Sequence, residues 1–583
     1  MPKTAAPGTW LGGVKAWILH RRAPLLFGVL LAALLPAHDL WAPDEPDFAQ
    51  IVREMQERGS WSLPYLNGLP YSEKPILFFW LLRLCSEAVL GIAGHGGEAG
   101  AIIPWALRLP SVLAAAGFAF AFRGWARRFL GPDRHEVPCA ILFSTPIWVW
   151  QAHTIQIDMV FASLLAWSWL SWLGGWLLET GTATPSSGAR AWFISAYLSL
   201  GLATLAKGPL ALVLSALVLA AFLLGQRSPR GFLRAHFGWG TLLVLLVVLP
   251  WYAWIGWTAG SAFLHELVIH QNIVRATRAW DHIQPWWRYL GYLAGDFFPW
   301  VLLLPPVLLG SWRRRRELGA PERFFLAAFL VPLVLLSLSQ SKQGKYLLMA
   351  YPFLALLIPE GLEPESTSAM PWVARWVRPA LLGSLWLLTG LLFGLAWLEF
   401  GGPTLRTQLA PFLPLLRILS LLAAGCALLA GSPILRNPPS RLIRATALAL
   451  ATQFLVAGAW GFRILDETKS YHRWTEAVRP LIQGRKVYFW QTLRSGAMVY
   501  TGQRMPELRT LAELERTLGP EDRLVSQKRE WDQDAWGMTP EARGRFEVLL
   551  RVPTGGSELL LLRRVPSAPP APPPATTDPA GPP

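Results

Sequence analysis

The sequence contains few charged residues and almost no cysteine. Only 15% of its 583 residues are charged, whereas a soluble protein of this size carries about 25%. The three cysteines, Cys85, Cys139 and Cys426, lie in apolar runs at spacings that fit neither a disulfide framework nor a metal knuckle. Hydrophobic residues make up 53% of the chain, and many apolar runs approach the roughly 20 residues that cross a bilayer. The sequence therefore predicts a polytopic α-helical membrane protein.

Acidic residues are scarcer than basic ones, with 37 Asp and Glu against 53 Lys and Arg and a formal net charge of +16. Such a charge can indicate nucleic-acid binding, but most Lys and Arg lie in short loops between apolar runs, which indicates membrane topology. We therefore expect no nucleic-acid partner. The first apolar run is not followed by a small-residue cleavage site, so we expect it to be a retained span and not a signal peptide.

Loop arginines indicate which runs cross the membrane, because short cytoplasmic loops are rich in Lys and Arg. Arg22 and Arg123 belong to two such clusters, and three apolar runs separate them, so one run cannot cross. The weakest is 76–94, which carries Arg83 and Glu87 and which we expect to be interfacial or re-entrant. Without this run, thirteen spans remain, and the N-terminus is cytoplasmic. The fourteen apolar runs are 23–40, 76–94, 104–122, 137–152, 158–178, 191–206, 208–225, 237–257, 291–311, 323–339, 345–360, 377–399, 410–431 and 442–463.

The composition predicts three parts of the chain. A transmembrane domain covers 1–464 and includes two outer loops, 40–103 and 258–290. Alternation of helical and strand patterns, including "KVYFW", "TLAELERTL" and "ELLLLRRV", predicts a small α/β domain over 465–567, which the topology places outside the cytoplasm. The tail 568–583 is rich in Pro and Ala, and we expect it to be disordered.

The topology places most polar side chains of the apolar region at outer ends of spans. Ionisable groups at membrane depth are costly and indicate a functional site by default. Several lysines on one side suggest an anionic ligand, phosphate above all, and nearby carboxylates suggest acid–base or metal chemistry. The residues in question are Asp44, Glu45, Asp47, Glu73, Lys74, His153, Asp158, Lys207, Lys342 and Lys345.

Structural roles are alternatives for several of these residues. Asp44 can cap the helix predicted from "DEPDFAQIVREM", and Asp158 can cap the span that follows it. Glu73 and Lys74 can form a surface ion pair of little consequence. Lys207 can extend from a helix–helix turn to the membrane surface.

The outer loop 258–290 combines aromatic and histidine residues. Its Trp280, Trp286 and Trp287 are typical of an aromatic belt at the membrane surface. The histidines offer metal ligands, although their spacing matches no zinc pattern; they are His265, His270 and His282.

One long motif resembles a known enzyme family. Residues 44–81 read "DEPDFAQIVREMQERGSWSLPYLNGLPYSEKPILFFWL", which closely resembles the first outer loop of the bacterial lipid A aminoarabinose transferases. These belong to the protein O-mannosyltransferase-like, GT-C class of membrane glycosyltransferases. The resemblance covers most of 40–360 and continues in "IQIDMVFA", "GLATLAKGPLALVL", "NIVRATRAWDHIQPWWRYL" and "SKQGKYLLMAYPFLALL".

The resemblance implies a GT-C fold with about thirteen transmembrane helices and an active site on the periplasmic side of the bacterial inner membrane. It implies that a sugar moves from undecaprenyl phosphate to lipid A phosphate, and we expect a monomer. By the same resemblance, Asp44 and Asp158 would be catalytic. Residues that would bind the donor phosphate are Lys74, Lys207, Arg275, Lys342 and Lys345, and those that would contact substrate are Glu45, Tyr71, Glu73 and Tyr346. A divalent metal, zinc or magnesium, would be held by Glu73, His265 and His270.

The chain departs from the family pattern at two places. Asp47 follows "DEP" where the family often has Arg, and Gln271–Asn272 stand where it often has Glu-His. Two alternatives therefore stay open: transfer of the sugar to protein or to another envelope glycan, and a lipid-linked sugar flippase. A flippase should carry polar groups through the span interiors, whereas here the charged groups other than Arg collect at the outer face.

Overall fold

The computed structural model describes residues 23–94, 100–181, 188–226, 234–274, 277, 282–362, 371–397, 402–435, 438–533, 538–554 and 557–565. The chain forms two compact units. The first comprises residues up to Asp39 together with Ile51–Asp466, and the second comprises Leu40–Gln50 together with Glu467 onward. A short stretch near the N-terminus is thus part of the C-terminal unit, which the sequence does not indicate.

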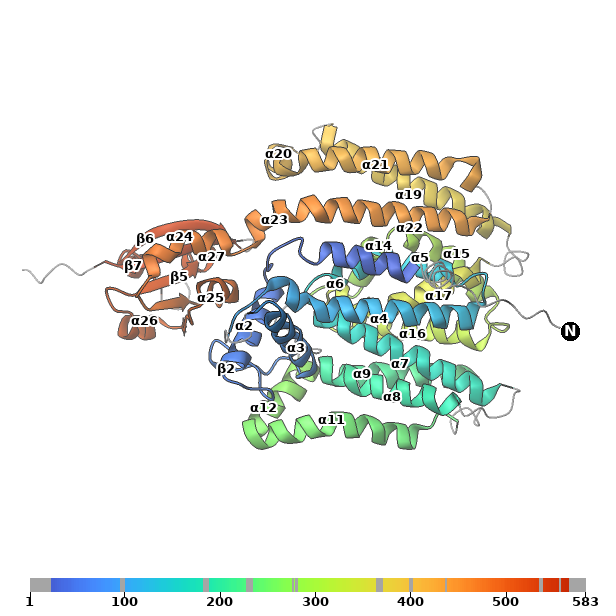
Figure 1. Ribbon diagram of the computed structural model, residues 1–583, viewed down its shortest axis with the longest axis horizontal. Helices are drawn as coiled ribbons and strands as arrows, with labels where there is room; N and C mark the ends of the chain where they lie inside the picture. The colour runs from blue at the N-terminus through green and yellow to red at the C-terminus, as the bar shows by residue number, and fades with distance from the viewer. Residues whose placement is uncertain are drawn as a thin grey trace, which may run out of the picture. The chain divides into compact units, whose positions relative to one another are not determined.

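Long helices make up the first unit, and many of them lie side by side (Figure 1). The helix α8 packs against α7, α9 and α11, while α19 packs against α21. The helices are Ala23–Leu34, α4 Pro104–Leu130, α5 Glu136–Phe143, α6 Pro146–Ala152, α7 Ile157–Thr180, α8 Gly188–Lys207, α9 Leu210–Gln226, α11 Phe237–Ala259, α12 Ser261–His265, α14 Arg288–Asp296, α15 Leu304–Arg313, α16 Ala320–Leu338, α17 Tyr351–Gly361, α19 Pro371–Trp397, α20 Gly402–Leu409, α21 Leu413–Gly431 and α22 Pro439–Val456.

Within the described residues, eight helices are long and apolar enough to cross a membrane, or nine if one bent pair counts as a single span. The prediction of a multi-pass α-helical protein is confirmed, but the count of thirteen regular spans is not reached. Some expected runs are broken. The run 137–152 divides into α5 and α6 because Pro146 favours extended backbone at Thr145, whose ψ is 121°. The run 291–311 bends by 110° between α14 and Trp300–Arg313.

The outer segment after α2 (Asp44–Glu57) begins with a small hairpin, β1 (Tyr65–Leu66) and β2 (Leu69–Pro70). Its turn is Asn67–Gly68, with φ of 52° and 84°, as two-residue Asn-Gly hairpin turns require. The buried carboxylate of Glu54 accepts hydrogen bonds from both turn amides, at 2.7 Å and 2.8 Å. The turn is therefore fastened directly to α2.

The helix α3 (Leu77–Ile92) follows, and it is not among the candidate spans of the described chain. Its Arg83 is buried, yet the guanidinium is well partnered. It donates to the carbonyls of Met55 and Ser60 at 3.1 Å and 2.7 Å, pairs with Glu87 at 2.6 Å, and lies 4.0 Å from the ring centre of Trp61. Arg83, whose charge led us to expect that 76–94 does not cross the membrane, thus fastens α3 to the end of α2.

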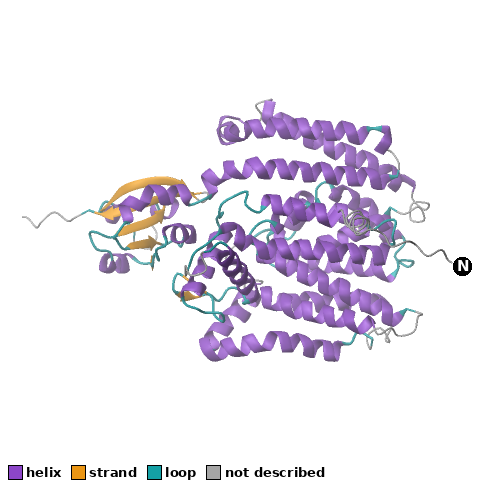
Figure 2. Ribbon diagram, in the orientation of Figure 1, coloured by secondary structure: helices purple, strands orange, loops and turns teal. Residues whose placement is uncertain are grey.

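The C-terminal part of the second unit is an α/β fold around a five-stranded sheet (Figure 2). The strand order is β4-β3-β5-β7-β6, with β3 parallel to β4 and β5, and β7 antiparallel to β5 and β6. The elements are α24 His472–Ile482, β3 Val487–Trp490, α25 Ser495–Thr501, β4 Glu507–Leu508, α26 Leu511–Thr517, β5 Arg523–Gln527, α27 Lys528–Trp531, α28 Pro540–Arg543, β6 Phe546–Thr554 and β7 Ser557–Arg564. The prediction of a small α/β domain is confirmed.

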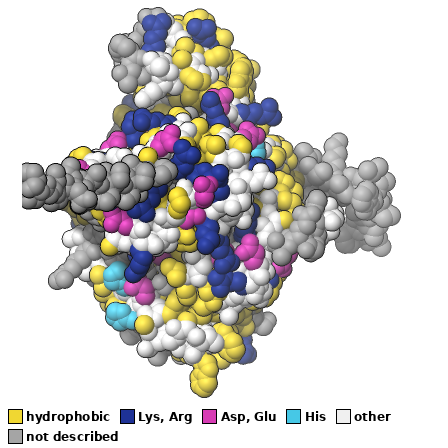
Figure 3. All heavy atoms as spheres, turned by 90° about the vertical axis from the view of Figure 1, so that its left-hand side faces the viewer, with side chains coloured by type: hydrophobic (Ala, Val, Ile, Leu, Met, Phe, Trp, Pro, Cys, Tyr) yellow, Lys and Arg dark blue, Asp and Glu magenta, His cyan; other side chains and the backbone are white. Residues whose placement is uncertain are grey.

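Alternating side chains fill a core on each face of this sheet, because successive residues of a strand point to opposite faces. Phe489 and Leu561 belong to one core with Trp474, while Trp490 and Leu562 belong to the other. The stretch Leu40–Gln50 joins this unit: the Leu40 amide donates to the Tyr500 hydroxyl at 3.2 Å. On the face shown in Figure 3, acidic and basic side chains are interspersed with hydrophobic ones.

Candidate active site

Two helix ends bring opposite charges together inside the first unit. Asp158 lies in the first turn of α7, and Lys207 is the last residue of α8. The Lys207 ammonium forms an ion pair with the Asp158 carboxylate, and both side chains are almost entirely buried. Each charge suits its place, since helix N-termini favour anions and C-termini favour cations. The carboxylate binds a lysine across the bundle and is not simply a helix cap.

A third charged residue comes from the 3-10 helix η3 (Gly344–Ala350). The Lys345 ammonium lies 3.9 Å from the second oxygen of Asp158 and 3.4 Å from the amide oxygen of Gln156. Tyr346 presents its ring to Lys207, whose Nζ is 4.5 Å from the ring centre. Two segments of the sequence, the end of α8 with Lys207 and η3 with Lys345 and Tyr346, thus meet beside one carboxylate.

We call Asp158, Lys207, Lys345 and Tyr346 the lysine cluster. Its two ammonium groups and one carboxylate leave one positive charge among these four side chains. Coulomb interactions are stronger where water is largely excluded, so a site of this kind favours an incoming anion over water. Chemically, the cluster can hold a phosphate and stabilise negative charge that develops on it.

The outer loop approaches the cluster at Asn272. The π-helix η1 (Glu266–Val274) carries Asn272, whose side-chain oxygen would lie 3.3 Å from a Cβ placed on Gly208. Gly208 directly follows Lys207 and has a φ of +103°, a conformation open mainly to glycine. Asn272 belongs to the pair Gln271–Asn272, one of the two places at which the chain departs from the family pattern. It is therefore a neighbour of the lysine cluster, which its position in the sequence alone does not show.

Lys342 has a different environment from the lysine cluster. Its buried ammonium donates to the carbonyl of Gln284, at 3.0 Å, and to that of Ser339. Its amide donates to the carbonyl of His282 at 3.0 Å. In the part of the chain that the structure describes, Lys342 forms no ion pair. These contacts fasten the end of the outer loop to the segment after α16.

The residues Glu73 and Lys74 do not pair with each other in the described structure, so the surface ion pair is not formed. The Lys74 ammonium instead donates to the carbonyl of Glu73 at 3.1 Å, and the Tyr71 hydroxyl donates to the Glu73 carboxylate at 3.4 Å. Glu73 is exposed, whereas Lys74 and Tyr71 are partly buried. The three side chains lie on one short segment between β2 and α3.

Asp44 and Glu45 belong to the second unit. They begin α2 and supply, with Asp47, the acidic first turn that a helix N-terminus favours. Glu45 is buried, and its carboxylate accepts a hydrogen bond from the Trp41 amide at 2.9 Å. Asp44 is only partly buried. Glu45 therefore has a structural role, while Asp44 presents part of its side chain to the surface.

The expected metal site is not assembled. Among the described residues there is no group of three or more His, Cys, Asp or Glu that could hold a metal ion. His270 instead pairs with Glu266 at 2.9 Å, and Glu266 also accepts from the Gln271 amide at 2.9 Å. The set of Glu73, His265 and His270 does not fit zinc or magnesium, and no chemical step is assigned to a metal. Arg275 lies outside the described residues.

Curated relatives are similar to this chain over more than half of its length. One from Pseudomonas paraeruginosa is 33% identical over 410 residues, which cover 69% of this chain and 70% of the relative, and is named undecaprenyl phosphate-alpha-4-amino-4-deoxy-L-arabinose arabinosyl transferase. The chain belongs to this arabinosyl transferase family. A relative with the same name from Pseudomonas aeruginosa is 32% identical over 344 residues, and this match spans 58% of each chain. No protein-family model matches the chain.

Solved structures of the same fold include ArnT from Cupriavidus metallidurans bound to undecaprenyl phosphate. It has 20% sequence identity and a TM-score of 0.70, and the match covers 95% of this chain and 98% of that one. The archaeal oligosaccharyltransferase AglB from Archaeoglobus fulgidus matches at 9% identity with a TM-score of 0.50, over 88% of this chain and 70% of that one. The expected GT-C membrane fold is thereby confirmed.

The charged residues of the lysine cluster are recognisable in the sequence, but Gln156 and Ser111 beside it are not. In the outer segment, the Asn67–Gly68 pair is a local signal for the hairpin turn, whereas no local pattern indicates its partner Glu54. Gln156 contacts Lys345, while its backbone exchanges hydrogen bonds with the Ser111 hydroxyl at 3.2 Å. No local pattern indicates Ser111 and Gln156, because they meet only through packing between α4 and the start of α7.

Proposed function

We propose that the protein is a membrane glycosyltransferase that moves 4-amino-4-deoxy-L-arabinose from undecaprenyl phosphate to a lipid A phosphate. The single observation that carries this proposal is the lysine cluster, a partly dry anion site in a member of the arabinosyl transferase family. The names of the relatives specify the donor lipid and the sugar. Membership in a transferase family favours an enzyme over a flippase.

The reaction breaks the bond between the anomeric carbon and an oxygen of undecaprenyl phosphate, and the electron pair stays on that phosphate. Because the leaving group is already an anion, it needs cations more than it needs a proton. Lys207 and Lys345 would stabilise its growing charge, with Lys74 as a further contact. The cation that develops at the sugar carbon would be stabilised by a carboxylate, Asp158 or Asp44.

The acceptor oxygen forms the new bond to the anomeric carbon. A lipid A phosphate is a competent nucleophile near neutral pH, so no general base is required for it. A hydroxyl acceptor on protein or glycan would need a base, and Asp158 is already engaged by lysines. Asp44 would then serve as the base. We place the reaction at the periplasmic face of the inner membrane, with the protein acting as a monomer.

The test uses the purified full chain with undecaprenyl-phosphate aminoarabinose and lipid A, followed by mass spectrometry of the lipid product. We expect lipid A to gain one aminoarabinose unit, and the Lys207→Met variant to lose about 100-fold or more in rate. Parallel reactions offer a peptide mixture and an envelope polysaccharide as acceptors. Transfer to the peptides or to the polysaccharide, and not to lipid A, would refute lipid A as the acceptor. Absence of transfer to any acceptor by a folded, donor-binding protein would refute the activity.

A further inference from the structure

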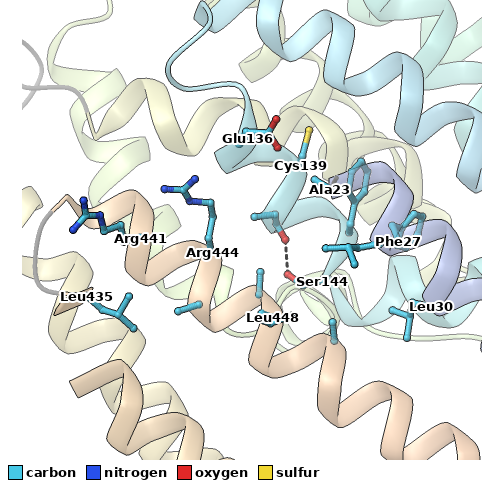
Figure 4. Close-up of a pocket in the computed structure, with 16 residues that line it drawn as sticks. Ala23, Phe27, Leu30, Glu136, Cys139, Ser144, Leu435, Arg441, Arg444 and Leu448 are labelled. Atoms are coloured by element: carbon cyan, nitrogen blue, oxygen red, sulfur yellow. Dashed lines mark hydrogen bonds between the residues drawn. The ribbon is translucent and has the colours of Figure 1, made fainter. Parts of the chain in front are cut away.

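An apolar groove, separate from the lysine cluster, lies between three helices of the first unit (Figure 4). Helix Ala23–Leu34, α5 and α22 line this groove, whose volume is about 490 Å³, a size typical of ligand pockets. Small side chains leave the space open: Ala23, Ala140, Ser144, Ala445, Ala447 and Ala451. Larger apolar side chains, Leu26 and Leu448, border it with 61% and 62% of their surface exposed.

Positive charge is concentrated at one end of the groove. Arg441 and Arg444 line it near the start of α22, at the same end as Glu136 (Figure 4). Both arginines are exposed, and within the described chain their only hydrogen bonds run to backbone carbonyls, of Ile434 at 3.5 Å and Ser440 at 3.2 Å. The Glu136 carboxylate pairs with Arg123 at 2.7 Å, so its charge is already balanced.

The length of the groove matches one leaflet of a bilayer. From Arg441 to Ala451 the helix α22 advances ten residues, or about 15 Å at 1.5 Å per residue, which is half of a hydrocarbon core of about 30 Å. Arg436, Arg441 and Arg444 lie close together in the sequence before an apolar run, and the positive-inside rule places such a basic cluster in the cytoplasm. A positive end at the level of the lipid headgroups and an apolar groove as long as one leaflet together fit a lipid with an anionic headgroup.

We propose that this groove binds one anionic phospholipid of the cytoplasmic leaflet. Arg441 and Arg444 contact the headgroup phosphate, and an acyl chain lies along the small side chains of α5 and α22. This lipid is distinct from the donor and the acceptor, because the groove is lined by none of the lysine-cluster residues. The proposal does not depend on the sugar or the acceptor of the enzyme.

The experiment is native mass spectrometry of the purified full chain, titrated with phosphatidylglycerol or with phosphatidylcholine of the same acyl chains. We expect preferential binding of phosphatidylglycerol. Arg441→Ala with Arg444→Ala should weaken that binding roughly 30-fold. The control, Arg315→Ala with Arg316→Ala, removes equal charge from another loop and should leave it unchanged. Ala451→Phe fills the groove and should reduce binding of both lipids.

Three outcomes would overturn the proposal. Phosphatidylglycerol preference that survives loss of Arg441 and Arg444, or that falls equally in the control, means that the arginines do not form a specific site. Unchanged binding in Ala451→Phe means that no acyl chain enters the groove. Binding that is seen only after residues 1–22 are deleted means that the chain's own N-terminal segment fills it. Circular dichroism of each variant excludes misfolding as the cause.

Discussion

The ammonium of Lys207, at the end of α8, forms an ion pair with the carboxylate of Asp158, at the start of α7. Both side chains are nearly buried, and Lys345 stands on the other side of the same carboxylate. Removal of one partner of a buried pair leaves an uncompensated charge, which costs more than the pair itself contributes. The pair is thus a structural support and an electrostatic element of the proposed site at once.

The two roles can be separated by a double-mutant cycle. Asp158→Asn and Lys207→Met should each lower the melting temperature of the detergent-solubilised protein, and the double variant should be more stable than the sum of the two losses predicts. Activity should stay low in the double variant, because Lys207→Met removes the stabilisation of the phosphate and Asp158→Asn does not restore it. Recovery of both stability and activity in the double variant would show that Lys207 acts only as a structural partner.

Lys342 and Lys345 lie three residues apart and should behave differently. Lys345→Met should raise the KM for the lipid-linked donor, because Lys345 faces Asp158 in the lysine cluster. Lys342→Met should leave that KM within about twofold and lower stability by about 1–3 kcal/mol, since it removes the hydrogen bonds of the ammonium to the carbonyls of Gln284 and Ser339. Thermal unfolding and donor titration measure the two effects. A large rise in KM for Lys342→Met would reassign it to the phosphate site.

Glu54 is predicted to control the position of the segment that carries Lys74. Its carboxylate holds both amides of the Asn67–Gly68 turn. Glu54→Gln keeps the size of the side chain but can accept at only one oxygen, and we expect a loss of about 1–2 kcal/mol with faster hydrogen exchange in 63–74. Exchange measured by mass spectrometry tests this, with Glu57→Gln on the same helix as the control. Equal exchange in both variants would contradict the fastening role.

The second unit should respond to pH through Glu530. Burial raises the pKa of this carboxyl above its usual range, and the charge of Arg494 only partly opposes the shift. The folded state therefore binds the proton more tightly than the unfolded state does, so the stability from Glu530 is present below its unfolded pKa and is lost as pH rises through its folded pKa. Glu530→Gln should flatten this dependence, measured by hydrogen exchange of β5 and α27 in the full chain. An unchanged pH profile would contradict it.

The sequence located charged residues that lie together in the structure, Asp158, Lys207 and Lys345, better than it predicted the backbone geometry. Lysines and carboxylates at outer ends of spans were found by topology, because charge in an apolar chain is conspicuous. Broken helices were not predicted: apolar residues continue on both sides of Pro146, and the break follows from the backbone restriction that the proline places on Thr145. The docking of Leu40–Gln50 onto the C-terminal unit depends on a contact 460 residues away, between Leu40 and Tyr500, which no local pattern reports.

Arg83 has a further consequence for the outer segment. Outside α3, its guanidinium contacts the carbonyls of Met55 and Ser60 and the ring of Trp61, so α3 cannot slide along its axis without breaking these contacts. Lys74 precedes the first residue of α3 by three positions, and Arg83 follows that residue by six, or about 9 Å along the axis. Arg83 therefore fixes the axial position of α3 relative to the end of α2, and with it the starting point of the short segment that carries Lys74.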